Sequence, residues 1–220
     1  MRKVRIAPGE YYHVFNRGVN KQMIFHDMRD FSRFLFLILY FQSPKVFTNL
    51  GRLIEDFVRH RVSHSIDQDV VRGRMVEIVS FCIMPNHFHL IVKEVSDEGI
   101  ASYMQRILNA YGKYYNTKYE KSGHVFQGPY RAVHVENDDQ LRYLSAYIHR
   151  NPREISKWFK KEDQYPWSSY SDVVKENRWG KLLVPEILMG EFKNVKDYDT
   201  FVKTSTAKLI QEEIQYLKDM

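Results

Sequence analysis

Cysteine and long apolar runs are what this 220-residue sequence has least of. Cys82 is the single cysteine, which excludes an intrachain disulfide and a cysteine-based zinc site, so metal ligands have to be histidine, carboxylate or amide oxygen. The apolar run at 34–41 is far shorter than the roughly 20 residues that cross a bilayer. Pro8 and Gly9 follow the basic start of the chain, where a signal peptide would have an apolar stretch. We therefore expect a cytoplasmic protein with no membrane partner.

Acidic residues are also in the minority, since 27 Asp and Glu face 33 Lys and Arg and the net charge is +6. A basic surplus suits a polyanionic partner because neutralised phosphates release counterions, although a basic protein without such a partner has the same composition. Aromatic residues make up 15% of the chain and are interleaved with the basic ones, and such a surface can stack unpaired bases. The composition therefore favours nucleic acid as the partner, and single strands in particular.

Hydrophobic periodicity predicts a mixed fold, with no internal repeat. Alternation and apolar density predict strands at 11–15, 76–84, 87–93 and 130–136. Helical spacing predicts helices at 27–42, 99–119 and 138–150, a shorter helix or arginine-rich insertion at 50–64, and a last helix at 195–217. The order of these elements is that of a ferredoxin-like split βαβ fold, class α+β: an antiparallel sheet with helices on one face and an open face for nucleic acid. We expect a domain at 1–152 and a C-terminal helical extension, 153–220, packed on it.

A pair of histidines in the strand at 87–93 is the first pattern with evident chemistry. His87 and His89 stand two residues apart, so their side chains project from the same face of the strand while Phe88 points into the core. Two imidazoles side by side can hold one divalent cation. By itself the pattern also describes an ordinary pair of strand histidines without a ligand, and both interpretations stay open.

The helix at 138–150 carries a tyrosine that can reach the same face. Its apolar stripe faces the sheet and consists of Leu141, Leu144 and Ile148. Tyr147 lies on the flank of this stripe, and Asn151 follows one turn later. A phenol, with a reference pKa of about 10, becomes a useful nucleophile when a metal polarises the phosphate that it attacks. Tyr143 lies on the neighbouring flank, and the residues alone do not choose between the two tyrosines or exclude a plain core-edge role.

Five ordered segments together resemble the HUH-type single-tyrosine transposases, and within them the branch associated with repetitive extragenic palindromes (REP). The segments are YHVFNRG at 12–18, MPNHFHL at 84–90, SGHVFQG at 122–128, YIHRNP at 147–152 and WSSY at 167–170. They extend over most of the chain. The HxH segment alone is a weak signal, whereas five matches in order at family-like intervals are specific.

This resemblance implies that His87 and His89 hold a divalent metal ion, Mg²⁺ or Mn²⁺, and that Tyr147 attacks single-stranded DNA bearing a hairpin or palindrome. The implied intermediate is a 5′-phosphotyrosine with a free 3′-hydroxyl, whose reversal joins strands without ATP. Many relatives have glutamine as a third metal contact four residues after the tyrosine. Asn151 fills that position here, as in the palindrome-associated branch, and its shorter side chain leaves direct ligation open. Homodimers and monomers both occur among such proteins, so the oligomeric state is open too.

Basic and polar side chains in or near the matched segments are expected to line a groove for DNA, although each one singly has the simpler explanation of a solvated charge. Four of them, which cluster near the loop at 123–124, are favoured: Lys113, Tyr114, Lys118 and Lys121. Pro129 departs from the arginine of many relatives, and Arg131 is the candidate to replace it. The predicted set is Arg17, Lys21, Lys113, Tyr114, Lys118, Lys121, His124, Arg131 and Arg150.

The prediction is therefore a metal-dependent DNA nuclease and strand transferase. A different class of function is a non-catalytic regulator that binds RNA or DNA on a ferredoxin-like sheet. Such a regulator has no use for two histidines and a tyrosine together. A third alternative is a replication or plasmid-mobilisation initiator with the same chemistry, although such chains are usually larger.

Overall fold

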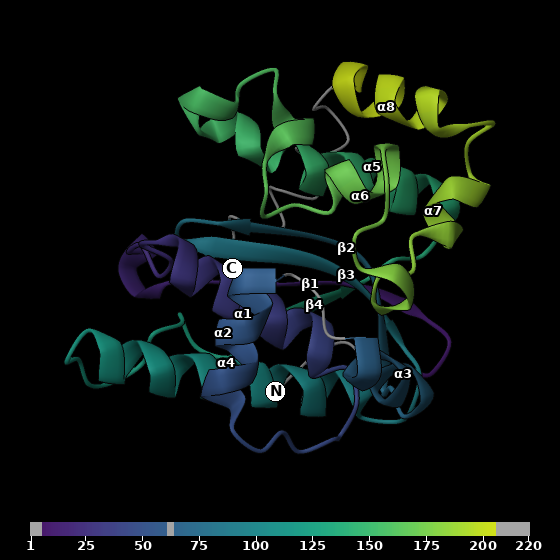
Figure 1. Cartoon of the computed structure of the whole chain (residues 1–220). Helices are drawn as coiled ribbons and strands as arrows, with labels where there is room; N and C mark the ends of the chain where they lie inside the picture. Colours follow the sequence, from purple (N-terminus) through teal and green to yellow (C-terminus); the bar gives the residue numbers. More distant parts are fainter. Residues whose placement is uncertain (1–5, 61–63, 206–220) are drawn as a thin grey trace.

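Figure 1 shows the computed structural model of the chain, which describes residues 6–60 and 64–205. Its strands form one antiparallel sheet in the order β2-β3-β1-β4. They are β1 (Tyr11–Arg17), β2 (Val76–Met84), β3 (His87–Glu94) and β4 (Arg131–His134). Helices separate β1 from β2 and β3 from β4, and β2 and β3 form a hairpin, so the topology is the ferredoxin-like split βαβ arrangement. The predicted α+β class is confirmed.

One face of the sheet is covered by α1 and α4, beyond which α2 and α3 lie (Figure 1). The bounds are α1 (Met28–Tyr40), α2 (Leu50–His60), α3 (His64–Arg72) and α4 (Gly99–Lys118). Asp27 starts α1 by accepting hydrogen bonds from the first backbone amides of the helix. The Tyr103 hydroxyl of α4 donates to the Ile38 carbonyl of α1 at 2.8 Å, which joins the two helices. Phe88 and Leu90 of β3 pack in the core beneath them.

The second face of the sheet is covered as well, by α5 (Asp138–Arg150) and the chain that follows it (Figure 1). The predicted stripe of α5 packs on Val79, Cys82 and Ile91. The expectation of helices on one face therefore holds for α1 and α4 but not for α5, and the face expected to be open is covered over β2 and β3. The physical reason is that β2 is buried along almost its whole length, and a strand apolar on both sides needs cover on both sides.

The segment after residue 152 contains short helices and one longer one. The helical turns are η2 (Asn151–Glu154), η3 (Ser156–Trp158), η4 (Glu162–Gln164), α6 (Tyr170–Val174), η5 (Gly180–Leu182), α7 (Glu186–Gly190) and α8 (Val195–Thr204), and η1 (Val19–Lys21) follows β1. His149 joins α5 to this C-terminal segment. Its Nε2 lies 2.9 Å from Ser169 Oγ, and its Nδ1 lies 2.6 Å from the Tyr198 hydroxyl. This packing agrees with an extension seated on the domain, while the boundary at 152 stays a prediction.

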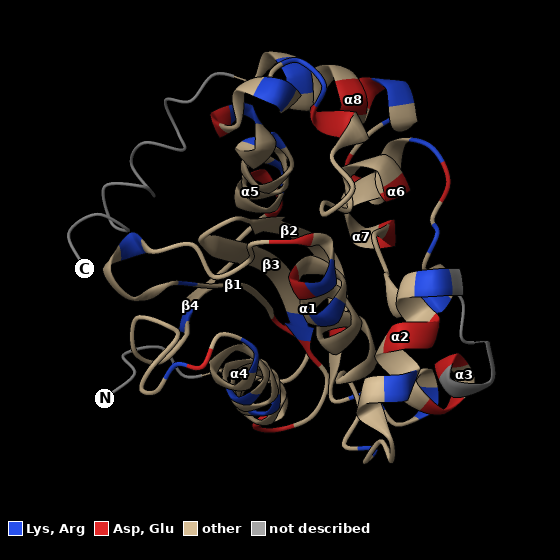
Figure 2. Ribbon diagram, turned by 60° about the vertical axis from the view of Figure 1, so that its left-hand side comes forward, with Lys and Arg blue, Asp and Glu red and all other residues tan. Residues whose placement is uncertain are grey.

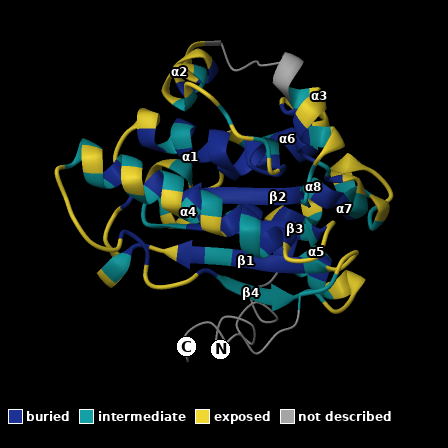
Figure 3. Cartoon of the chain, turned by 90° about the horizontal axis from the view of Figure 1, so that it is seen from below, coloured by how far each residue is buried: buried dark blue, intermediate teal, exposed yellow. Residues whose placement is uncertain are grey.

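Most predicted boundaries differ from the observed ones by only a few residues. The largest differences are α3, which was not predicted, and the helix expected at 195–217, of which α8 is the part inside the described residues. Figure 2 shows charged residues of both signs on the outer helices and few on the strands, and Figure 3 shows that the central strands consist mostly of buried residues. Among the described residues, no helix is both long and apolar enough to cross a membrane.

Candidate active site

The two predicted histidines lie side by side at the start of β3. A two-residue turn at 85–86 closes the β2–β3 hairpin, so that Met84 pairs with His87 and Cys82 with His89. The imidazole centroids of His87 and His89 are 5.0 Å apart, and their rings stand nearly perpendicular at 79°. Strand alternation therefore brings both rings to the α5 side of the sheet, as the spacing predicted.

His87 has an amide oxygen at each ring nitrogen. Its Nε2 lies 3.0 Å from Asn151 Oδ1, and its Nδ1 lies 2.6 Å from Asn86 Oδ1. Both amides are oriented by their NH₂ groups, because Asn151 Nδ2 donates to the Tyr147 carbonyl at 3.0 Å and Asn86 Nδ2 to the Lys21 carbonyl at 3.2 Å. The hydrogen bonds of the two NH₂ groups fix the orientation of both amides, so an amide oxygen, and not an NH₂ group, faces each ring nitrogen of His87.

This arrangement fits a cation. Burial lowers the pKa of His87 below its ordinary value, although the hydrogen bond to Asn151 opposes the shift, so the ring is neutral near pH 7. A neutral imidazole carries one N–H and cannot donate to both oxygens. With the proton on Nδ1, facing Asn86, Nε2 keeps its lone pair and lies 3.0 Å from Asn151 Oδ1. An imidazole nitrogen and an amide oxygen at this distance can share a divalent cation, whose remaining positions DNA phosphate oxygens and water would fill.

His89 has a different neighbour, which the sequence reasoning did not single out. Its Nδ1 lies 2.9 Å from Nε2 of His13 on β1, and both side chains are buried. Burial lowers the pKa of His13 to about 3 and that of His89 well below its usual range, so both rings are neutral. Within the described residues, no cluster of three His, Cys, Asp or Glu side chains could hold a metal ion. Metal binding by His87, His89 and Asn151 stays a prediction.

Tyr147 completes the group from the opposite layer. Its ring centroid is 5.2 Å from that of His89 and 6.4 Å from that of His13, in edge-to-face geometry. Burial raises the pKa of Tyr147 to about 12, and a hydrogen bond from the Asn151 side chain offsets part of that rise. The competitor Tyr143 packs instead against Phe201 of α8, with ring centroids 5.2 Å apart. The fold brings Tyr147, and not Tyr143, to the histidines of the same chain.

A carboxylate near these residues was also missed. Glu154 ends η2, three residues after Asn151 and seven after Tyr147, so the three share one side of the helical path from α5 into η2. Its charge raises the pKa values of both His87 and Tyr147, after the larger effects of burial and of the Asn151 hydrogen bond. In the sequence, Tyr147, Asn151 and Glu154 follow an i, i+4, i+7 spacing, and this helical spacing is the signal that could have predicted Glu154 beside the site.

Three of the predicted DNA-binding residues lie on or beside the strands that carry the site. Arg17 pairs with His87 across β1 and β3, and its Nε donates to Gln127 Oε1 at 2.6 Å. Lys21 is exposed, and its carbonyl binds Asn86. Arg131 stands on β4 opposite Phe15, whose ring is 5.8 Å from that of His89.

The other predicted residues are not gathered at the site. The α4 residues lie on the far side of the sheet from Tyr147: Lys113 is exposed, Tyr114 donates to Asp30 at 2.9 Å, and Lys118 is ion-paired with Asp27 at 2.7 Å and Asp30 at 2.6 Å. Two others follow α4 in the chain: Lys121 lies 3.3 Å from the Tyr115 hydroxyl and His124 is exposed. Arg150 donates to Ser205 after α8. For all of them, contact with DNA stays a prediction.

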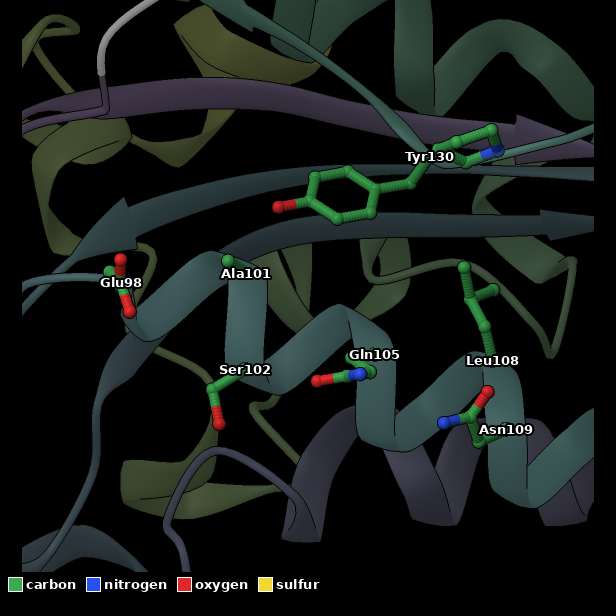
Figure 4. A pocket seen from close by; sticks show the side chains of 8 residues that line it. Glu98, Ala101, Ser102, Gln105, Leu108, Asn109 and Tyr130 are labelled. Carbon is green, nitrogen blue, oxygen red and sulfur yellow. The ribbon is translucent and has the colours of Figure 1, made fainter. Parts of the chain in front are cut away.

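A separate groove lies elsewhere on the molecule. It has a volume of about 590 Å³ and runs between α4 and the start of β4. Figure 4 shows Gln105 and Asn109 on α4 with the ring of Tyr130 opposite them. Since this groove lies on the α4 side of the sheet, it is separate from the group around Tyr147. The choice of the Tyr147 group as the candidate active site is therefore based on the chemistry of its side chains and not on the depth of a pocket.

Comparisons with known proteins concern the family and the fold of the chain. A family model described as "Transposase IS200 like" matches residues 51–151, a range that contains His87, His89, Tyr147 and Asn151. A solved structure described as a REP-associated tyrosine transposase bound to a REP hairpin has a similar fold. The TM-score is 0.53, with 15% identity over 79% of this chain and 84% of that chain. Among curated proteins, no sequence matches.

Proposed function

We propose that this chain is an IS200-like transposase that cuts and rejoins single-stranded DNA with Tyr147 as its nucleophile. The observation that carries the proposal is the convergence of Tyr147, Asn151 and the two histidines within one chain, with ring centroids of Tyr147 and His89 5.2 Å apart. The same observation supports a tyrosine that acts in cis, on DNA bound by the histidines of its own chain. The hairpin bound by the similar solved structure supports hairpin-bearing DNA as the substrate.

The proposed reaction exchanges one phosphodiester for another. The Tyr147 oxygen attacks phosphorus, the bond from phosphorus to the 3′ oxygen breaks, and a 5′-phosphotyrosine and a free 3′-hydroxyl result. The phenol loses a proton and the departing 3′ oxygen gains one. Because one ester replaces another, attack by a 3′-hydroxyl on the phosphotyrosine reverses the step and joins strands without an added energy source.

His87, His89 and Asn151 are the residues that would hold a divalent metal ion such as Mg²⁺ or Mn²⁺. When bound, such an ion supplies Lewis-acid polarisation of the phosphate and stabilises the developing charge. The residues of the chain also position the nucleophile. The Asn151 side chain, which contacts both Tyr147 and His87, orients the phenol relative to the histidines.

The test is covalent capture. The full chain is incubated with Mn²⁺ and a pool of single-stranded hairpin oligonucleotides, and protein-linked DNA is sought on a denaturing gel. Tyr147→Phe should abolish the adduct and leave DNA binding nearly unchanged, while the matched control Tyr143→Phe should leave both unchanged. Cleavage that persists in Tyr147→Phe would overturn the proposal. Binding without any adduct across many hairpins would favour the non-catalytic regulator.

A further inference from the structure

An exposed aromatic side chain among lysines follows directly after the Tyr147 helix. Residues 155–161, the Phe159 turn, have the sequence ISKWFKK. Phe159 is 54% exposed, and it is the only exposed phenylalanine or tryptophan in the part of the chain that the structure describes. Three exposed lysines surround it, and none is ion-paired within residues 6–60 and 64–205: Lys157, Lys160 and Lys161.

The shape of the Phe159 turn is fixed by its backbone. The Trp158 amide donates to the Ile155 carbonyl at 2.8 Å, and the Lys161 amide donates to the Trp158 carbonyl at 2.9 Å. Lys160 has a left-handed backbone with φ of 60°, which disfavours a residue with a side chain. Trp158 points inward and packs edge-on against Tyr165, with ring centroids 5.5 Å apart. One aromatic ring anchors the turn, which leaves Phe159 facing water.

The turn is tied to the end of the sheet that carries the histidines. The Tyr165 hydroxyl donates to the Ile83 carbonyl at 2.8 Å, one residue before Met84, which pairs with His87. An ion pair between Arg153 and Glu162 closes the base of the segment. Tyr147 and Trp158 pack against the same apolar cluster. The Phe159 turn therefore lies on the same side of the sheet as Tyr147, near the strand end that carries the histidines.

We propose that the Phe159 turn binds single-stranded DNA next to the active site, with a base stacked on Phe159 and phosphates held by the three lysines. This inference rests on the proposed function, since it takes single-stranded DNA as the substrate. Every base has a face that can stack on an aromatic ring, and lysine contacts to phosphate do not depend on sequence. The turn is thus a sequence-tolerant guide, separate from the recognition of any hairpin.

The experiment measures binding of labelled oligothymidine by fluorescence anisotropy, with a chelator present so that no cleavage occurs. Phe159→Ala should weaken binding about tenfold, and Phe159→Trp should restore it. The triple variant Lys157→Gln, Lys160→Gln, Lys161→Gln should lower the slope of log affinity against log salt by about 2. The matched control is Met28→Ala, which removes another exposed apolar side chain, at the start of α1.

Unchanged binding by Phe159→Ala, or an equal loss in Met28→Ala, would overturn this inference. Failure of this inference and failure of the proposed function are distinguishable, because cleavage by a Tyr147→Phe protein refutes the nucleophile while oligothymidine affinity tests the turn.

A second and independent observation is the buried contact between the imidazoles of His13 and His89, 2.9 Å apart. The two neutral rings share one proton between these nitrogens. If His89 donates from Nδ1, its Nε2 keeps a free lone pair. If His13 donates instead, the His89 proton resides on Nε2 and that nitrogen cannot ligate a cation.

We infer that His13 is a positioning residue that accepts the Nδ1 proton of His89 and so keeps Nε2 available as a ligand. Asn86 does the same for His87, because its Oδ1 can only accept a proton. Each ligand thus has a neighbour that selects its tautomer, in keeping with the outer-shell partners that orient metal-ligating histidines.

Two measurements on the full chain test this role. In metal-free protein, ¹⁵N NMR should find the His89 proton on Nδ1, and a proton on Nε2 would refute the inference whether or not the protein cleaves DNA. In Mn²⁺ titrations followed by electron paramagnetic resonance, His13→Leu should weaken binding about 10- to 100-fold. His13→Gln, whose amide oxygen can accept the same proton, should restore most of it. Equal Mn²⁺ affinity in wild type and His13→Leu would also refute it.

Discussion

The sharpest quantitative prediction concerns His149, the residue that joins the tyrosine helix to the C-terminal layer. Its side chain is fully buried, stacks on Tyr170 with ring centroids 5.2 Å apart, and contacts Ser169 and Tyr198 through its two nitrogens. Burial lowers the pKa of His149 to about 3. In the unfolded chain the same imidazole has a pKa of about 6.5.

The sign of the pH effect follows from these two values. Below about pH 6.5 the unfolded chain binds a proton that the folded chain does not, so stability is complete above this pH and is lost as the pH falls. At pH 5 the loss from His149 alone is about 2 kcal/mol, and it depends little on the folded pKa as long as that value stays well below 5.

The assay is urea unfolding of wild type and His149→Gln at pH 7.5 and at pH 5. Both proteins share every other titrating group, so the difference between their pH effects isolates His149. Wild type should lose about 2 kcal/mol more than the variant, which is about 1 M in urea midpoint. Equal losses would refute the reasoning, because they would mean that the folded protein accepts a proton on His149.

Three further predictions concern the site and its support. Asn151→Ala should weaken Mn²⁺ binding about tenfold, as measured by titration, whereas Asn151→Asp should retain it; equal affinity of the alanine variant would remove Asn151 from the donor set. The initial rate of adduct formation should rise about tenfold per pH unit between about pH 7 and 9, because the pKa of Tyr147 is about 12, and a flat profile would argue against phenolate attack. Asp30→Asn should cost about 3 kcal/mol in thermal unfolding, because Lys118 would lose its buried partner; a cost below about 1 kcal/mol would show that the pair is weak.

Local patterns were sufficient for most of the secondary structure. The bounds of β2 and α5 agree with the predicted residues because their apolar periodicity continues up to sharp stops, at Pro85 and at the Asn151–Pro152 pair. The spacing of His87 and His89 also fixed their common face, since alternation along a strand is a property of the backbone. The sequence by itself therefore determined most of the elements, their order and the common face of the two histidines.

Pairings between distant residues were decided by the tertiary structure. Which face of the sheet α5 covers depends on the second apolar side of β2, and no periodicity within α5 reveals it. Tyr143 and Tyr147 are equivalent along the helix, and only the packing of α8 against Tyr143 separates them. His13 lies 76 residues from His89 and meets it because β1 pairs with β3. The periodicity of a sequence shows which face of a helix or strand a residue lies on. Strand register and the packing of layers decide which distant residues it contacts there.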